Sequence, residues 1–160
     1  MTKLNIRQAN INDAALIHHF ITELAIYEKA EHEVKATVRD IETSMFGANS
    51  SVSALICEQA GKAIGFAVYF YNYSTWLGKN GLYLEDLYVS PKFRGCGAGK
   101  LLLKHLANIA VEQGCGRFEW SVLDWNTPSI DFYDSIGAKP KNEWIGYQLT
   151  GNDLLAFSKS

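Results

Sequence analysis

Residues 88–106, YVSPKFRGCGAGKLLLKHL, combine a glycine-rich turn with the start of an amphipathic helix. Glycine recurs at Gly95, Gly97 and Gly99. Glycine readily adopts positive φ angles, which let successive backbone N–H groups point into one concavity. A helix that begins there adds the positive end of its dipole. Because residues 87–111 also include several bases and no acid, this stretch predicts an anion site, and such turns usually hold a phosphate.

The spacing of this turn does not fit two common phosphate loops. A P-loop needs G-x-x-x-x-G-K-[ST], but Arg94 stands at the first glycine and Leu101 replaces the magnesium-binding hydroxyl residue. A dinucleotide-binding turn would need a glycine at Lys100. The pattern [Arg/Gln]-x-x-Gly-x-[Gly/Ala] does fit, as Arg94-Gly95-Cys96-Gly97-Ala98-Gly99. A flexible turn before a basic helix remains the alternative.

The preceding strand contains a candidate general base. Residues 82–89, LYLEDLYV, are apolar apart from Glu85 and Asp86, and the period of a strand directs these two acids to opposite faces. A buried carboxylate has a raised pKa and is costly unless it is paired or used. We therefore expect Glu85 to be buried and to act as a base, and Asp86 to be structural. In the alternative, the strand is half exposed and both acids are solvated or ion-paired.

A second helix start lies at residues 126–129. Thr127 can cap this helix, with Pro128 at its first position, and the open backbone amides together with Asn126 suit a polar ligand. Tyr133 follows Ser129 by four residues and therefore shares its helical face. Tyr133 is a candidate proton donor, because a phenol with a pKa of about 10 stays protonated at neutral pH. A core aromatic residue is the alternative.

Apolar periodicity and end signals predict the elements that position these residues. Residues 4–7 alternate like a short strand, and a helix capped by Asn12 or Asp13 runs to about Lys29. Thr37 and Asp40 form a predicted capping box for a shorter helix. The remaining predictions are strands at 52–59, 63–71 and 82–90, a helix at 99–113, a strand at 118–123, a helix at 127–137, and one or two closing strands at 144–149 and 154–157.

This order predicts one α/β domain over residues 1–160, with a mixed β-sheet flanked by helices on both faces. The 160 residues are 48% apolar, which allows a sizeable core. The net charge of −2 disfavours nucleic-acid binding. The chain lacks an apolar run of the ~18 residues that span a bilayer and an apolar signal core, so we expect a cytoplasmic protein that does not bind membranes. The 3 cysteines lack C-x-x-C spacing, which argues against disulfides and a metal site.

Three stretches, ELAIYE (residues 23–28), YLEDLYVSPKFRGCGAG (83–99) and VLDWNTPSIDFYDSIGA (122–138), together resemble the Gcn5-related N-acetyltransferase (GNAT) superfamily. The resemblance extends over nearly the whole chain and favours the spermidine/spermine (diamine) and thialysine N-acetyltransferase branch. It implies the GNAT fold and acetyl-CoA as the cosubstrate, whose pyrophosphate would bind at the glycine turn. The residues that it assigns to the cosubstrate are Leu87, Tyr88, Val89, Arg94, Gly95, Cys96, Gly97, Ala98, Gly99, Lys100, Asn126, Thr127, Pro128 and Ser129.

The resemblance also implies roles in an acyl transfer to an amine. Glu85 would contact the amine and Tyr133 would protonate the departing thiolate. The other residues assigned to a small cationic acceptor are Tyr27, Glu28, Trp76, Glu119, Trp120 and Ser121. The polyamine enzymes have acids where this chain has Ser74 and Ile145. A shorter diamine, thialysine or another amine is therefore as plausible an acceptor as spermidine, with an aminoglycoside as a side substrate.

We expect direct transfer within a ternary complex, without an acetylated Cys96. Two alternatives remain open, a non-catalytic domain that senses coenzyme A and a peptide or protein N-acetyltransferase. A homodimer is expected from the resemblance alone.

Overall fold

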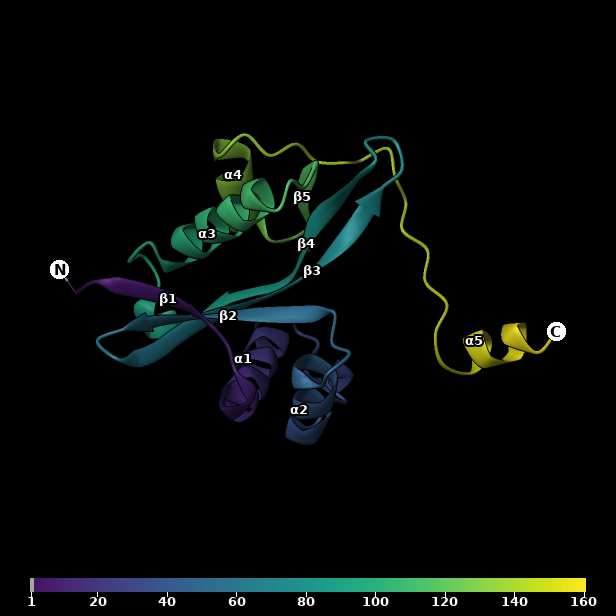
Figure 1. Cartoon of the computed structure of the whole chain (residues 1–160), viewed down its shortest axis with the longest axis horizontal. Helices are drawn as coiled ribbons and strands as arrows, with labels where there is room; N and C mark the ends of the chain where they lie inside the picture. Colours follow the sequence, from purple (N-terminus) through teal and green to yellow (C-terminus); the bar gives the residue numbers. More distant parts are fainter. Residues whose placement is uncertain (1) are drawn as a thin grey trace. The chain divides into compact units, whose positions relative to one another are not determined.

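The structure is a computed structural model that describes residues 2–160. The chain divides into two compact units, and the boundary in the sequence lies between Ser121 and Val122. The first unit is built on a sheet with the strand order β1-β2-β3-β4-β5 (Figure 1). Its strands are β1 (Leu4–Gln8), β2 (Val52–Gln59), β3 (Lys62–Ser74), β4 (Lys79–Val89) and β5 (Arg117–Trp120). Strands β1 to β4 pair antiparallel, and β5 pairs parallel to β4, so the sheet is mixed as predicted.

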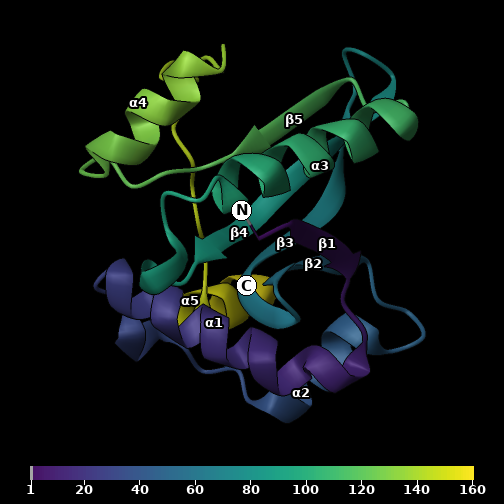
Figure 2. The ribbon, with the colours of Figure 1, turned by 90° about the vertical axis from the view of Figure 1, so that its left-hand side faces the viewer.

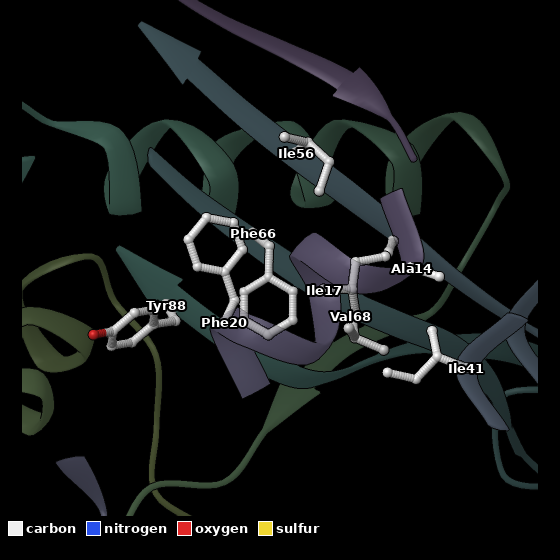
Figure 3. Close-up of a cluster of buried hydrophobic side chains, with 9 residues drawn as sticks. Ala14, Ile17, Phe20, Ile41, Ile56, Phe66, Val68 and Tyr88 are labelled. Carbon is white, nitrogen blue, oxygen red and sulfur yellow. The ribbon is translucent and has the colours of Figure 1, made fainter. Parts of the chain in front are cut away.

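Helices cover both faces of this sheet (Figures 1 and 2). Helices α1 (Ala14–Tyr27) and α2 (Val38–Phe46) lie on one face, and α3 (Ala98–Glu112) lies on the other. Phe20 of α1 stacks on Phe66 of β3 with ring centres 5.3 Å apart, inside a core that includes Tyr88 of β4 (Figure 3). The α/β fold class and the two-sided packing are confirmed.

Local sequence signals account for most element boundaries. Thr37 and Asp40 form the predicted capping box of α2, with both reciprocal hydrogen bonds present. Ala60 and Gly61 take positive φ angles of 52° and 76°, which makes the two-residue turn of the β2–β3 hairpin. Asp13 occupies the N-cap position of α1 as predicted, but its side chain makes no capping hydrogen bond there. Instead, Asn10 caps a short 3₁₀ helix, η1 (Ile11–Asp13), which leads into α1. The other 3₁₀ helices are η2 (Glu31–Glu33) and η3 (Pro91–Phe93).

The second unit contains helices α4 (Thr127–Ser135) and α5 (Gly151–Ser158). The predicted closing strands at 144–149 and 154–157 are wrong. Residues 144–149 pair with no other strand in the described part of the chain, and residues 154–157 lie inside α5. Thr150 is extended and precedes α5, with Asp153 in the first turn, which is a favourable helix start. The apolar residues Leu154, Leu155 and Phe157 fit either structure, since short apolar runs do not separate helix from strand.

None of the helices within residues 2–160 has the length and apolar character needed to cross a membrane. In the same residues, no group of three or more His, Cys, Asp or Glu side chains could hold a metal ion. The prediction that residues 1–160 form one domain stays a prediction.

Candidate functional site

The predicted anion turn connects β4 to α3 through η3. Gly95 and Gly97 have φ angles of 83° and 88°, in the left-handed region that side chains disfavour. Gly97 is the residue that precedes α3. A Cβ atom placed on either glycine would meet no heavy atom of the described chain within 4 Å, so the space over the turn is open. These glycines are thus needed for backbone conformation, and they leave room for a ligand.

The first turn of α3 offers unpaired donors to that space. The first backbone bond of the helix runs from the Leu101 N–H to the Gly97 carbonyl at 2.9 Å, so the preceding amides lack intrahelical acceptors. No acid lies in this turn, and the side chain of Lys100 is exposed. Amide donors, the helix dipole and a nearby base suit a pyrophosphate group.

Cys96 lies within the turn, but its thiol hydrogen-bonds to the backbone just before the turn. Its Sγ donates to the carbonyl of Phe93 at 2.8 Å, while the side chain remains exposed.

Strand β4 is interrupted by a bulge at Glu85. Val68 of β3 pairs with Asp86, and the next residue, Tyr69, pairs with Leu84, so Glu85 has no partner on β3. A bulge displaces the strict alternation of side chains between the two faces. The prediction that Glu85 is buried is therefore wrong: Glu85 is exposed, whereas Asp86 is half-buried.

Asp86 is the functional candidate that sequence reasoning missed. Burial, together with the nearby carboxylates of Glu85 and Glu28, raises the pKa of Asp86 to about 6. Burial also raises the pKa of Glu28, at the end of α1. The structure thus brings the two predicted acids, Glu28 and Glu85, near a third. The local sequence signalled the acidic pair but not the bulge.

The end of β4 has an open edge. The parallel ladder with β5 runs from Gly81 opposite Arg117 to Leu84 opposite Trp120 and stops there within the described residues. On its other side, β4 remains paired with β3 as far as Val89. The backbone of Leu87, Tyr88 and Val89 can therefore accept an extended ligand as an additional strand-like partner.

The predicted acceptor residues are distributed along β4 and β5. Glu119 lies opposite Tyr83 and forms an ion pair with Arg117 at 2.7 Å. The Ser121 hydroxyl hydrogen-bonds to the Tyr83 hydroxyl at 2.9 Å. Trp120 lies opposite Leu84, directly before the bulge. These residues lie beside the strand that carries the carboxylates.

Trp76 is not close to the carboxylates. It lies in the β3–β4 turn and is 89% exposed. Glu85 follows Lys79 by six positions along the extended strand, a span of about 20 Å at ~3.3 Å per residue. Ser74 is buried and accepts a hydrogen bond from the Leu77 N–H at 3.2 Å. In this chain that position supports the turn.

The second unit contains the other predicted residues. Asn126 precedes α4, and Thr127, Pro128 and Ser129 form its first turn. The first helical bond joins the Ile130 N–H to the Asn126 carbonyl at 3.1 Å, and the Asn126 side chain does not cap the helix. Tyr133 lies one turn further along and is half-buried. The start of α4 is therefore another set of amides without intrahelical acceptors.

A mixed sheet with a bulged fourth strand, an open strand end and a glycine turn before a helix defines an acyltransferase-type α/β site. The model of the acetyltransferase (GNAT) family matches residues 16–138. The chain belongs to the GNAT acetyltransferase family, and it is an N-acetyltransferase.

Similar curated proteins point to one branch of this family. The chain is 35% identical to the thialysine N-epsilon-acetyltransferase of Mus musculus, covering 96% of each chain. It is 36% identical to the human spermidine/spermine N(1)-acetyltransferase-like protein 1 over 93% of this chain and 22% of that one. The Arabidopsis thaliana L-ornithine N5-acetyltransferase NATA1 is 29% identical, with 96% and 87% covered.

Solved structures agree on the fold. An integron cassette protein from the mobile metagenome of V. cholerae, VCH_CASS6, matches with a TM-score of 0.83 and 29% identity, over 100% of this chain and 99% of that one. An aminoglycoside acetyltransferase from a soil metagenome matches with a TM-score of 0.77 at 16% identity, over 93% and 97% of the two chains, and supports the fold alone.

Proposed function

We propose that this N-acetyltransferase transfers the acetyl group of acetyl-CoA to a primary amine of a small cationic acceptor, directly and within a ternary complex. One observation carries the proposal. The open edge of β4, between the bulge and the glycine turn, leads from a group of carboxylates to a set of free backbone amides. This arrangement offers one end for an ammonium group and the other for a phosphate.

The chain's own residues suit acetyl-CoA, which acetyltransferases of this family use as cosubstrate. The amides at Gly97–Lys100 would hold the pyrophosphate, and the backbone of residues 87–89 would pair with the pantetheine arm. The amides and Asn126 at the start of α4 would provide a second polar contact. Bound acetyl-CoA supplies the activated thioester.

The carboxylates have two tasks in the transfer. They attract the cationic acceptor, and one of them accepts a proton from its amine. A lysine-like amine has a pKa of ~10.4, so forming the neutral nucleophile at pH 7 costs about 4–5 kcal/mol. Glu85 and Asp86 are the candidate bases, because both lie at the bulge. The nitrogen attacks the acetyl carbonyl, the C–S bond breaks, and Tyr133 protonates the leaving thiolate.

The acceptor belongs to a group of short cationic amines. The relatives are named for thialysine, ornithine and spermidine/spermine, each of which has at least one primary amine. The family resemblance implies acids of the polyamine enzymes at the positions of Ser74 and Ile145, and the absence of these acids would disfavour a long polycation. We propose a diamine or a diamino acid of similar length, with peptides and aminoglycosides as poorer substrates.

A steady-state screen tests this function. Purified protein is incubated with acetyl-CoA and thialysine, ornithine, putrescine, spermidine, an aminoglycoside or a lysine peptide, and thiol release and product mass are measured. We expect the highest kcat/KM for a short amine. Silence with every amine despite tight coenzyme A binding would instead support a sensor domain, and a preference for the peptide would support a protein acetyltransferase.

A further inference from the structure

The side chain of Arg94 leaves the glycine turn and lies on two tyrosines from other elements. Its guanidinium carbon is 5.2 Å from the ring centre of Tyr27, at the end of α1, and 5.4 Å from that of Tyr88, on β4. Its Nε donates to the carbonyl of Val89 at 3.0 Å. One side chain therefore connects the turn with both α1 and β4.

These contacts suit arginine in particular. A planar guanidinium can lie over aromatic faces and still donate in its own plane, which a lysine ammonium cannot do. Tyr88 is a fixed support, because it is 6% exposed and packs on Phe20 of α1 with ring centres 6.2 Å apart. Tyr27 lies at the end of α1 and is 39% exposed. Arg94 thus links the Tyr27 ring to a well-packed strand.

Glu28 directly follows Tyr27. At the end of α1, the backbone N–H of Glu28 donates a hydrogen bond to the carbonyl of Leu24 at 2.9 Å. Glu28 is one of the carboxylates that act on Asp86. The Arg94–Tyr27 contact therefore lies next to one of the carboxylates that act on Asp86.

We propose that Arg94 is a positioning residue that couples the binding of acetyl-CoA to the acceptor side of the site. This inference rests on the proposed function, in which the amides of the turn bind the pyrophosphate. Gly95 and Gly97 give the free turn many backbone conformations, and a bound anion selects one of them. The backbone position of Arg94 is then fixed. Through the contact of its side chain with Tyr27, the positions of Tyr27 and Glu28 are fixed as well. Since coupling is reciprocal, a bound acceptor also tightens coenzyme A binding.

Three variants separate this role from a direct role in phosphate binding. Arg94→Gln keeps a residue that the turn pattern permits, but it removes the cationic, planar group from the two rings. Tyr27→Leu breaks the same contact from the α1 side without changing the turn. Lys92→Gln removes a charge from an exposed neighbour in η3 and is the matched control.

Hydrogen exchange, with coenzyme A alone as the probe, measures the coupling without an acceptor. In the unaltered protein, we expect saturating coenzyme A to slow exchange both in residues 94–102 and at the end of α1, residues 24–30, by about fivefold or more. In Arg94→Gln and Tyr27→Leu, the turn should still be protected while the end of α1 is not. Lys92→Gln should behave like the unaltered protein.

The outcomes separate failure of the coupling from failure of the function. Protection of α1 in Arg94→Gln equal to that in the unaltered protein would overturn the coupling. So would protection of the turn alone in the unaltered protein. Loss of all protection in Arg94→Gln at any coenzyme A concentration would make Arg94 a phosphate ligand instead and also overturn it. Absence of protection at the turn of the unaltered protein would contradict the proposed function itself.

Discussion

The acids at the bulge differ in their surroundings, although they are neighbours in sequence. Asp86 is half-buried with a pKa raised to about 6, while Glu85 is exposed. A carboxylate accepts a proton or binds an ammonium group only when ionised. The ionisation of Asp86 therefore sets a pH limit for any step that needs its charge.

The variant Asp86→Asn tests that limit. If the charged form of Asp86 serves the reaction, kcat/KM of the unaltered enzyme should fall as the pH drops through about 6. Asp86→Asn should lose at least about 10²-fold in kcat/KM at pH 7.5 and should lack this acidic limb. Glu85→Gln should keep the limb, and its activity should partly recover at high pH, where free amine is abundant. Loss of the limb in Glu85→Gln alone would return the role to Glu85.

Asp86→Asn, which should lower the activity, should raise the stability of the folded protein at neutral and higher pH. The folded-state pKa of Asp86 lies above the unfolded value of ~3.9, so the folded protein binds the proton more tightly. The stabilisation that comes from the tighter binding of this proton is present below about pH 4 and is lost as the pH rises to about 6. At pH 8, Asp86→Asn should raise the free energy of unfolding by about 1–2 kcal/mol in urea titrations. A loss of stability at pH 8 would show that the carboxylate has a structural partner.

Tyr133 is the candidate acid, and its hydroxyl can be removed without changing the ring. Tyr133→Phe should lower kcat by about 10²-fold, because the thiolate then leaves without a proton donor. Calorimetry should show coenzyme A affinity within about threefold of the unaltered value, since the proposed contacts to the cosubstrate are elsewhere. An unchanged kcat would remove Tyr133 from the mechanism.

At the scale of elements, the turn between β4 and α3 depends on backbone conformation. Gly97 has a φ of 88°, whereas a Cβ on Gly99 would make only an ordinary contact of 3.9 Å with Val89. Alanine is disfavoured at positive φ by about 1–2 kcal/mol but is acceptable in the first turn of a helix. The two glycines should therefore respond differently to the same substitution.

Gly97→Ala should lower the free energy of unfolding by about 1 kcal/mol and weaken coenzyme A binding about tenfold or more, because the turn amides change direction. Gly99→Ala should leave both quantities nearly unchanged. Urea unfolding and calorimetry measure them. Equal effects of the two substitutions would argue against a role for the left-handed conformation at Gly97.

At the scale of the whole molecule, the two units differ in how they are built. The first unit has a continuous buried core between the sheet and its helices. In the second unit, none of the residues 122–160 is buried, although it contains Trp144, Ile145 and Tyr147. A segment that buries so little cannot offset the conformational entropy of ordering its own chain.

Truncation tests this difference. A chain that ends at Ser121 should unfold cooperatively in urea, whereas a peptide of residues 122–160 should show no cooperative transition. The truncated chain should lack acetyltransferase activity, because it lacks Asn126 and Tyr133. A truncated chain that shows no cooperative unfolding would mean that the sheet needs the second unit.

The local sequence predicted much of the fold, including the glycine turn between β4 and α3. The box at Thr37 and Asp40, the hairpin turn at Gly61 and the helix start after Gly97 each depend on a few neighbouring residues. Each of these features is determined by the φ angles of a few residues and by hydrogen bonds within one turn of the chain. The strand order β2-β3-β4 followed for the same reason, because short turns connect adjacent strands.

Only the tertiary structure decided which of the two acids is the less exposed, where the β4–β5 ladder ends, and that Arg94 lies on Tyr27. The bulge at Glu85 arises from pairing with β3, and the Arg94–Tyr27 contact joins residues that are 67 positions apart. The pattern of residues 154–157 was ambiguous for a similar reason, since a strand exists only where another strand pairs with it. Packing between segments that are distant in sequence determines such features. A local pattern of residue types does not show which distant segments will pack together.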